Sequence, residues 1–204
     1  MTMALQIVRL INKPISSNCF VVYDKAFGGD CFIIDPGSED SCGLMALMDE
    51  EGLVPKFIML THEHFDHCWG CNAIQGRYNV PIMCSEICAQ RVRNHKTNYS
   101  VFYCPDKSFD VTGEIRIVCD KEIFDFANYN VECFYTPGHT ESSICIRIGN
   151  NLFTGDTLIR RMKTVTKLPG GSKEKSRQSI CMIKTLSDVI SDICPGHGGI
   201  MQMQ

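Results

Sequence analysis

The sequence predicts an α/β protein built as a layered sandwich, with two mixed sheets packed face to face and helices outside. Three observations predict this class. Short apolar runs recur along the chain between turn residues, such as KFIML at 56–60 and LFTG at 152–155. Segments with helical spacing lie between these runs in both halves of the chain. The composition, 44% hydrophobic and 21% charged over 204 residues, is ordinary for a globular protein, and we expect one domain over residues 1–204.

Strands and helices alternate in the first half of the chain. Residues 28–30, Gly-Gly-Asp, predict a hairpin turn, and Pro36 ends the strand that returns from it. Ser38 is a candidate cap for the helix that follows. The expected strands are 5–11, 18–23, 31–35, 56–60 and 80–84. The expected helices are 38–51, 66–76 and 85–94.

The second half of the chain is richer in strands. Residues 95–112 are polar and irregular, and we expect a loop or lid there. A helix is expected over 172–186. The expected strands are 115–119, 121–124, 131–136, 143–148, 151–154 and 189–194. The order of elements fits two mixed sheets, although periodicity alone leaves their topology open.

Charge and hydropathy exclude two classes of partner and leave a small-molecule substrate as the expected one. The formal net charge is -3, from 20 basic and 23 acidic residues, so we expect no binding to nucleic acid or to an anionic membrane. No stretch reaches the ~18 apolar residues of a membrane span, and the first residues, MTMALQIVRLINKP, fit a strand rather than a signal peptide. One local basic cluster is interpreted as a solvated loop and helix face. Its members are Arg160, Arg161, Lys163, Lys167, Lys173, Lys175 and Arg177.

The 13 cysteines, an odd number without framework spacing, favour a reducing compartment, and we expect a cytoplasmic protein. Cys68 and Cys71 form a CxxC, but no second CxxC follows, so a structural zinc site is not expected. Cys84 and Cys88 are four residues apart, as on one face of a helix. We interpret these thiols mainly as small, buried apolar residues.

The strongest signal for function is the segment 61–67, Thr-His-Glu-His-Phe-Asp-His, directly after a buried strand. Side chains at the carboxyl end of a strand are in the usual place for an α/β site. His62 and His64 are two residues apart in an extended turn and can point the same way. Asp66 and His67 fall in the first turn of a helix and can face a neighbouring point, so one loop could serve two metals. Taken alone, this motif also allows a single-metal site or a chance match.

Three further fragments place a histidine or aspartate just beyond a predicted strand, next to glycines that let the backbone crowd a small site. They are TPGHT with His139, FTGDT with Asp156 and CPGHG with His197. Five of the six histidines of the chain fall in these four segments. The sixth, His95, lies in a polar run and is interpreted as a surface residue. The four segments together indicate a metal site.

The same segments resemble the metallo-β-lactamase superfamily, and within it the hydroxyacylglutathione hydrolase (glyoxalase II) branch. The resemblance extends from about residue 18 to residue 199. It is carried by NCFVVYD, IIDPG, THEHFDHCWG, TPGHTESSICI, LFTGDTL, LPGGS and CPGHGG, in this order. The resemblance implies a four-layer αββα sandwich with the site along one edge of the sheets.

The resemblance also implies a binuclear metal centre. The first metal would be held by His62, His64 and His139, the second by Asp66, His67 and His197, and both by Asp156. Zinc is the first choice for these ligands, and iron or manganese are also possible. Asp35 of IIDPG matches a position near the site and is expected to support it or shape a turn rather than to bind metal. Cys68 and Trp69 are expected only to pack beside the site.

The implied reaction is hydrolysis of a small ester-like substrate, with a thioester as the first choice, by a hydroxide that bridges the two metals. Asp66 would orient this nucleophile and accept a proton. Two other kinds of activity stay open on this scaffold. One is an iron-dependent oxidoreductase of the persulfide dioxygenase type, and the other is a lactonase or phosphodiesterase. A metal-binding module without catalysis is a third class.

Two departures from the glyoxalase II pattern bear on the substrate. Within the segment 159–168, Thr164, Val165 and Lys167 stand where that branch often has Gly-Arg and Asp, so the polar contacts of this loop are altered. The sequence ends seven residues after His197, whereas full-length glyoxalase II continues with a helical domain that grips glutathione. We therefore expect a smaller or different acyl thioester, lactone or ester to be as acceptable as a glutathione thioester.

Overall fold

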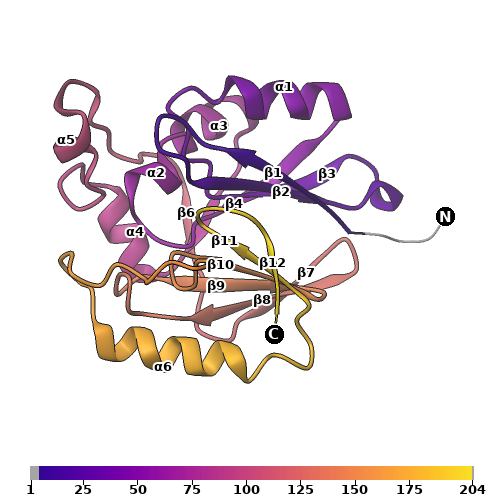
Figure 1. Ribbon diagram of the computed structural model, residues 1–204. Coiled ribbons are helices and arrows are strands. Elements are labelled where there is room, and N and C mark those ends of the chain that lie inside the picture. The colour runs from indigo at the N-terminus through magenta and orange to yellow at the C-terminus, as the bar shows by residue number, and fades with distance from the viewer. Residues whose placement is uncertain (1–4, 204) are drawn as a thin grey trace.

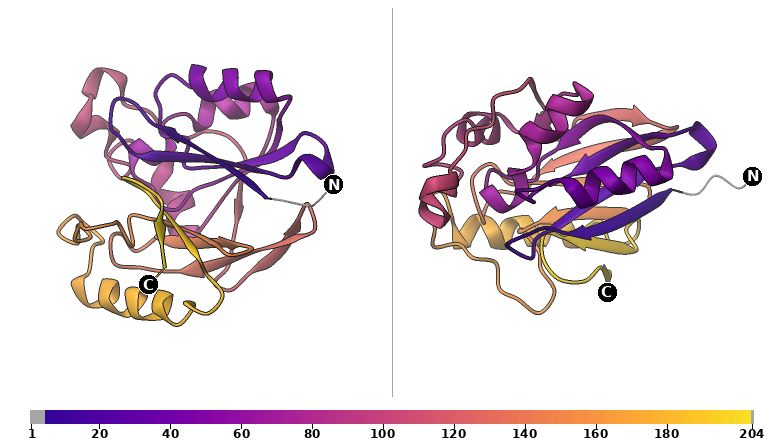
Figure 2. Two further views of the ribbon diagram at one scale, coloured as in Figure 1. Left: turned by 45° about the vertical axis from the view of Figure 1, so that its right-hand side comes forward. Right: turned by 90° about the horizontal axis from the view of Figure 1, so that it is seen from above.

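The computed structural model describes residues 5–203. Residues 1–4 and 204, which belong to the predicted domain 1–204, lie outside the described residues. Two six-stranded mixed sheets pack face to face, with α1 and α3 on the outside of one sheet and α6 on the outside of the other (Figures 1 and 2). This arrangement is a four-layer αββα sandwich. The fold class predicted from the sequence is confirmed.

The first sheet holds the N-terminal half of the chain in the order β1-β2-β3-β4-β5-β6. Its strands are β1 (Gln6–Ile11), β2 (Asn18–Tyr23), β3 (Asp30–Ile34), β4 (Val54–Met59), β5 (Ile82–Cys84) and β6 (Ile115–Ile117). The first three strands pair antiparallel and the last four pair parallel. Parallel neighbours need crossover connections, which the helices between them supply.

The second sheet holds the C-terminal half in the order β12-β11-β10-β9-β8-β7. Its strands are β7 (Ile123–Phe126), β8 (Tyr129–Tyr135), β9 (Ile144–Ile148), β10 (Asn151–Gly155), β11 (Asp192–Pro195) and β12 (Met201–Gln202). Only the β10–β11 pair is parallel. The crossover between these two strands contains α6, which therefore covers the outer face of this sheet.

The helices are short, and two of them begin at serine caps. They are α1 (Cys42–Glu51), α2 (Phe65–Cys68), α3 (Cys71–Tyr78), α4 (Glu86–Val92), α5 (Ser100–Tyr103) and α6 (Lys173–Lys184), with 3-10 turns η1 (Lys25–Phe27) and η2 (Pro105–Lys107). The hydroxyl of Ser85 accepts from the Cys88 N–H ahead of α4, and that of Ser172 accepts from the Lys175 N–H ahead of α6. Such caps satisfy backbone donors that have no partner within the helix.

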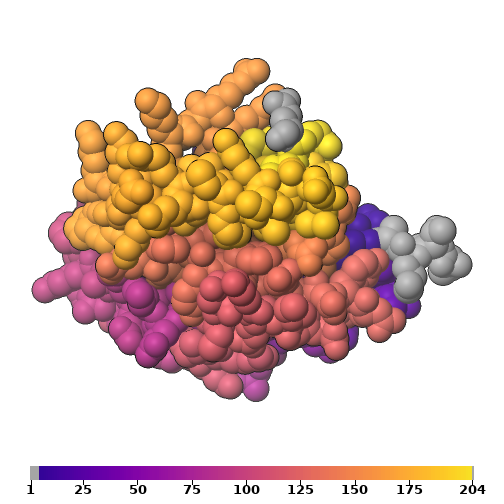
Figure 3. Space-filling model, turned by 90° about the horizontal axis from the view of Figure 1, so that it is seen from below, coloured from indigo at the N-terminus to yellow at the C-terminus, as the bar shows by residue number. Residues whose placement is uncertain are grey.

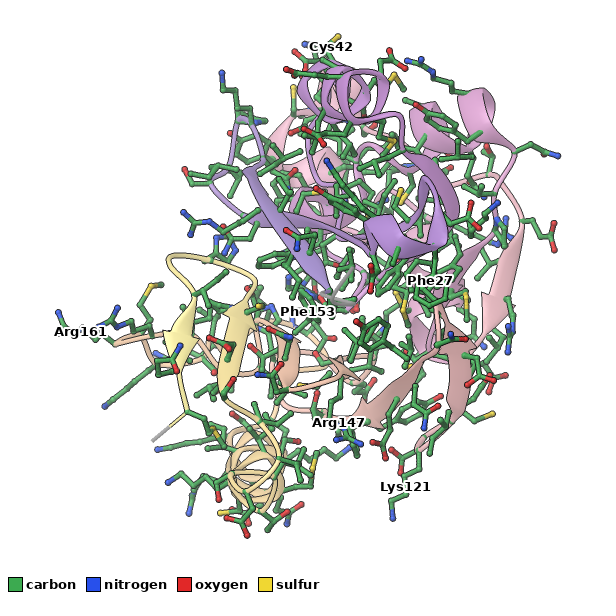
Figure 4. All side chains as sticks on the ribbon, turned by 90° about the vertical axis from the view of Figure 1, so that its right-hand side faces the viewer. Phe27, Cys42, Lys121, Arg147, Phe153 and Arg161 are labelled. Atoms are coloured by element: carbon green, nitrogen blue, oxygen red, sulfur yellow. The ribbon has the colours of Figure 1, made fainter. Side chains whose placement is uncertain are left out.

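Three apolar clusters separate the four layers. Along β2, Val21 packs in the cluster under the N-terminal helices, while Phe20 and Val22 pack in the cluster between the sheets. Figure 4 shows Phe153 of β10 in this interior, facing the first sheet. A third cluster joins Ile183 of α6 to the second sheet. Strands such as β2 are buried on both faces, which explains why they are continuous apolar runs in the sequence.

The predicted single helix 66–76 is wrong, because α2 and α3 are separate elements. Gly70 lies between them, and its N–H donates to the Pro36 carbonyl at 2.7 Å. A side chain at Gly70 would collide with the Ser41 hydroxyl. The loop after β3 therefore packs against the chain where the helix would have continued, and a glycine allows this approach.

Two finer predictions are also wrong. Ser38 does not cap α1, because its hydroxyl donates to the Asn12 side chain and accepts from the Lys13 N–H. Cys84 does not share a helix face with Cys88, because Cys84 ends β5. Both thiols are nevertheless fully buried, as expected of small apolar residues.

The remaining differences concern short elements. Residues 95–112, expected as a loop, contain α5 and η2, and the two-residue strand β12 has no counterpart among the predictions. Within residues 5–203, no helix has both the length and the apolar character that a membrane crossing requires.

Candidate metal centre

The seven predicted metal ligands follow strand ends at one edge of the sandwich. The 61–67 loop follows β4, His139 follows β8, Asp156 follows β10 and His197 follows β11. α2, which begins inside this loop, lies at the same end of the molecule as α4 and α5 (Figure 1). Residues far apart in the sequence meet there because the two sheets bring these strand ends together.

His62, His64 and His139 form the first group. Their candidate ligand atoms lie within 4.8 Å of one another. The Nε2 atom of His139 is 3.0 Å from the Nδ1 atom of His64, and the rings of His62 and His139 meet edge to face at 4.8 Å. All three side chains are buried. Three imidazoles aimed at one point form a set that suits zinc or iron.

Asp66, His67 and His197 form the second group, also with ligand atoms within 4.8 Å. The Asp66 Oδ2 atom is 3.4 Å from Nε2 of His197 and 3.7 Å from Nε2 of His67. His67 is fully buried, whereas His197 is partly exposed. This group therefore has one side open to solvent.

Asp156 lies between the two groups. Its Oδ2 atom is 3.5 Å from Nε2 of His139 and 3.6 Å from Nε2 of His197, and its Oδ1 atom is 3.6 Å from Nε2 of His67. The carboxylate thus faces histidines of both groups. Gly196 allows this crowding, because a Cβ there would collide with the Asp156 carboxylate and the His67 ring.

Several buried polar atoms of the cluster residues have no hydrogen-bond partner among the described residues. They are Nε2 of His62, His64 and His67, and Oδ1 of Asp156. Buried polar atoms are almost always satisfied, so a cluster of unsatisfied lone pairs needs a ligand. Four such atoms on imidazole and carboxylate groups fit divalent metal ions, and the residues present therefore suit a metal centre.

Burial keeps two of the imidazoles neutral. It lowers the pKa of His62 well below its ordinary value, and the neighbouring imidazole of His67 adds to the effect. It also lowers the pKa of His64 to about 4, with His139 contributing in the same direction. Neutral imidazoles have the free lone pair that metal binding requires.

The second group is charged. Burial alone would lower the pKa of His67, but the carboxylates of Asp66 and Asp35 outweigh it and raise the pKa to about 10. Burial would likewise raise the pKa of Asp66, yet His67 and His197 hold it well below its usual range. Asp66 is therefore ionised at neutral pH.

Asp35 supports the cluster from behind. Its carboxylate accepts from the Thr61 N–H at 2.8 Å and from the Thr61 hydroxyl at 2.6 Å, and it receives the Nδ1–H of His67 at 2.9 Å. With a metal bound in place of the second proton, the proton on Nδ1 would leave the lone pair of His67 on Nε2, the atom that faces the cluster. The supporting position expected for Asp35 matches this geometry.

A second support, absent from the sequence predictions, surrounds Glu63. This side chain is 1% exposed, its Oε1 atom accepts from Arg91 of α4 at 2.9 Å, and its Oε2 atom accepts from the hydroxyls of Thr140 and Ser142. Glu63 lies between His62 and His64, and Thr140 follows His139 directly. The network therefore ties the 61–67 loop to the loop that carries His139.

Two further contacts lie at the solvent side of the first group. The ring of Tyr99 meets that of His64 edge to face at 5.1 Å, and its hydroxyl donates to the Pro169 carbonyl at 3.4 Å. Nδ1 of His139 lies 2.8 Å from the Val165 carbonyl. The 95–112 segment and the altered 159–168 loop thus both reach the cluster. No sequence signal pointed to Tyr99.

The predicted bystanders lie where they were expected. The Cys68 thiol donates to the Glu63 carbonyl at 3.4 Å and is fully buried, and Trp69 stacks on Phe109. His95 pairs with Asp110 at the surface. The structure therefore brings together all seven predicted ligands and leaves these residues out of the cluster, while the metal-binding role of each ligand stays a prediction.

Comparisons with known proteins agree with this geometry. Residues 12–87 match the family model of the metallo-beta-lactamase superfamily. A probable metallo-hydrolase of Methanocaldococcus jannaschii is 30% identical over 203 residues, covering 95% of this chain and 93% of that protein. An uncharacterized protein of Mycobacterium leprae is 31% identical over 192 residues (89% and 86%), and a hydroxyacylglutathione hydrolase of Pelagibacter ubique is 28% identical over 198 residues (96% and 71%).

Solved structures show the same fold. The crystal structure of the B3 metallo-beta-lactamase BLEG-1 superposes with a TM-score of 0.87 at 23% identity, covering 97% of this chain and 94% of that one. A di-iron-bound form of TTHA1623 superposes with a TM-score of 0.82 at 21% identity, covering 96% and 94%.

Fold and site together define an αββα protein with a histidine- and aspartate-rich cluster suited to divalent metals. The chain belongs to the metallo-beta-lactamase superfamily.

Proposed function

We propose that the chain is a binuclear metal-dependent hydrolase that acts, as one domain, on a small thioester. The observation that carries this proposal is the position of Asp156, whose carboxylate faces His139 of the first group and both His67 and His197 of the second. A carboxylate shared by two ligand groups is the arrangement that two adjacent cations need. The similarity to a hydroxyacylglutathione hydrolase, named for an acylated glutathione, supports a thioester.

Two divalent cations, with zinc as the first choice and iron or manganese as alternatives, would polarise the substrate carbonyl and make water acidic enough to react near neutral pH. His62, His64 and His139 would hold one cation, and Asp66, His67 and His197 the other, with Asp156 on both. The buried, neutral state of His62 and His64 suits this role.

Asp66 would take the proton from the attacking water. Its pKa is held well below the usual range, so the carboxylate is ionised at neutral pH, and Oδ2 faces Nε2 of His197 at 3.4 Å. A thioester and one water would give a carboxylic acid and a thiol, so that the atoms and protons of the reaction balance. The Asp35–His67 and Glu63–Arg91 contacts would hold these groups in place.

The decisive experiment combines metal analysis with a substrate panel on the full chain. Zinc, iron and manganese are quantified by mass spectrometry, and thiol or acid release is followed with S-lactoylglutathione, an N-acetylcysteamine thioester, a lactone and a phosphodiester. We expect about two metals per chain and fastest turnover of a thioester, lost on chelation and restored by metal.

Other outcomes point to other functions. Oxygen uptake with glutathione persulfide and a single bound iron would replace the proposal with the oxidoreductase alternative. Faster cleavage of the lactone or phosphodiester would change the substrate class. Full activity after exhaustive chelation would reject metal-dependent hydrolysis altogether.

A further inference from the structure

A second pocket lies outside the metal centre, between α6, the segment after β10 and the C-terminal strand β12. Its volume is about 610 Å³, within the range of small-molecule sites. None of the seven candidate metal ligands lines it. The lining residues are Leu158, Arg160, Arg161, Ile180, Ile183, Lys184, Ile193, Ile200, Met201, Gln202 and Met203. The proposed hydrolase does not account for this pocket.

The floor and walls of the pocket are apolar. Ile183 of α6 and Ile193 of β11 form part of the buried core beneath it, with 0% and 3% of their surfaces exposed. Leu158 and Met201 pack against the same cluster from the sides. Ile200 remains 39% exposed at the rim. The apolar surface that a ligand could still cover belongs to Ile180, Ile200 and Met201, which line the pocket and are half-buried or exposed. An apolar chain laid against them would remove that surface from water, which favours binding.

The rim of the pocket is cationic. Among the described residues, no hydrogen bond or ion pair engages the side chains of Arg160, Arg161 or Lys184. By contrast, Arg77 and Arg147, for example, pair with carboxylates. No acidic residue is among the described residues that line the pocket. Three unpaired cations around an apolar floor complement an anionic group attached to an apolar chain.

The two arginines are presented by a defined turn. Ile159 and Met162 form an isolated β-bridge, with the Met162 N–H donating to the Ile159 carbonyl at 3.3 Å, so Arg160 and Arg161 occupy its tip. Figure 4 shows Arg161 standing out beside the C-terminal strands, and Figure 3 shows this segment projecting next to the C-terminal residues. The turn is anchored below by the Thr154 hydroxyl, which donates to the Leu158 carbonyl at 2.8 Å.

We propose that this pocket binds a free long-chain carboxylate. The apolar chain lies against Ile180, Ile200 and Met201, and the carboxylate pairs with Arg160 and Arg161. Guanidinium groups bind carboxylates in a two-point geometry. Lys184 closes the other side of the rim. The site is independent of the metal-dependent reaction, so its test does not require an active enzyme.

The experiment measures binding of dansyl-undecanoic acid to the purified full chain by fluorescence, with dodecanoate as competitor. Dodecanol and dodecyltrimethylammonium are the head-group controls. Hexanoate and octanoate test how affinity depends on the length of the ligand's hydrocarbon chain. We expect dodecanoate to bind at least roughly ten-fold more tightly than dodecanol, because a charge-assisted pair is lost in the alcohol. Each methylene should contribute about a three- to four-fold gain in affinity.

Matched variants distinguish binding in the pocket from a general effect of positive charge on the loop. Arg160→Ser with Arg161→Ser should weaken dodecanoate binding by at least roughly ten-fold. Lys163→Ser with Lys167→Ser removes the same charge from the same loop, outside the pocket lining, and should change affinity by less than about two-fold. Ile200→Ser, at the exposed rim, should weaken the binding of long-chain carboxylates more than that of short ones.

Three outcomes would overturn the proposal. One is equal binding of dodecanoate and dodecanol, and another is an equal loss of affinity in the two double-serine variants. The third is evidence for a different occupant of the pocket. Sedimentation with phosphatidylglycerol vesicles, without binding of free dodecanoate, would indicate a membrane surface. A dimer that dissociates in the Arg160→Ser, Arg161→Ser variant would indicate a second copy of this protein.

Discussion

The Nδ1 atom of His67 lies 2.9 Å from the Oδ2 atom of Asp35, and this buried contact orients the imidazole toward the cluster. The same carboxylate receives both donors of Thr61, the residue that begins the 61–67 loop. A single side chain on the loop after β3 therefore sets both the start of the motif and the ring of one predicted ligand. Removing this carboxylate should lower metal affinity more than it lowers the stability of the fold.

We predict that Asp35→Asn weakens metal binding by roughly 10- to 100-fold, because the amide cannot accept from Thr61 and His67 as the carboxylate does. Asp35 has a positive φ of 52°, a conformation that asparagine also tolerates, so the backbone is preserved. The measurement is competition with a chromogenic chelator, with thermal unfolding as a check that the variant folds.

Asp24→Asn is the matched control for that variant. Asp24 is also buried and hydrogen-bonded, but it follows β2 and accepts from the Ala26 N–H and the Tyr129 hydroxyl. It should lose stability without losing metal affinity. Equal metal affinities in Asp35→Asn and the unmodified chain would show that Asp35 only shapes a turn.

Asp156→Ala should remove a ligand shared by both groups, and we expect loss of both metals and of turnover. Cys68→Ala is the control, because Cys68 lies beside His67 in sequence but its thiol donates to the Glu63 carbonyl. It should keep its activity and lose about 1 kcal/mol of stability from the small cavity. Metal content and turnover are measured on both variants, and near-normal turnover in Asp156→Ala would reject its assigned position between the two cations.

The strand pattern and the ligand cluster were accessible from the sequence for physical reasons. Buried strands such as β2 and β3 are nearly continuous apolar runs, because both faces of each sheet are covered. The chain has six histidines, and five of them lie at predicted strand ends, which is a strong signal. The division of the ligands into two groups came from the resemblance to the metallo-β-lactamase superfamily.

What the sequence did not predict depends on contacts between distant segments. The break between α2 and α3 at Gly70 is set by the loop after β3, which local periodicity does not report. In the sequence, nothing distinguishes Arg91 from other helix residues. Its contact with Glu63 arises only because the fold packs α4 against the 61–67 loop. Tyr99 lies in a segment without periodicity and reaches His64 only through the fold.

The Glu63–Arg91 pair gives a stability prediction. Arg91→Gln leaves the buried Glu63 carboxylate without its cation, and we expect a loss of about 2–4 kcal/mol in the free energy of unfolding, because an unpaired buried charge is costly. Glu141→Gln removes the other partner of the same guanidinium, at 2.6 Å but 42% exposed, and should cost less than about 1 kcal/mol.

Urea unfolding of both variants measures the difference, and the double variant Glu63→Gln, Arg91→Gln should regain part of the loss by removing the orphaned charge. Similar costs for Arg91→Gln and Glu141→Gln would show that Arg91 acts as a surface cation and does not hold the 61–67 loop.

The cysteines give a prediction about reactivity and pH. Three of the 13 thiols are exposed, Cys42, Cys119 and Cys181, and Cys104 is half-buried. Burial raises the pKa of Cys145 to about 12, and those of Cys133 and Cys194 similarly. Only the thiolate reacts, and its share falls about ten-fold for each pH unit below the pKa, so raising the solution from about pH 7 to about pH 9 should leave these three thiols unreactive. The remaining buried thiols are shielded from the reagent by their packing.

Iodoacetamide labelling followed by peptide mass spectrometry measures this directly. The native chain should be modified at the three exposed positions and more slowly at Cys104, at both pH values, while the other nine cysteines react only after unfolding in guanidinium. Rapid labelling of Cys68 or Cys71 in the native chain would contradict this packing, because both side chains are fully buried.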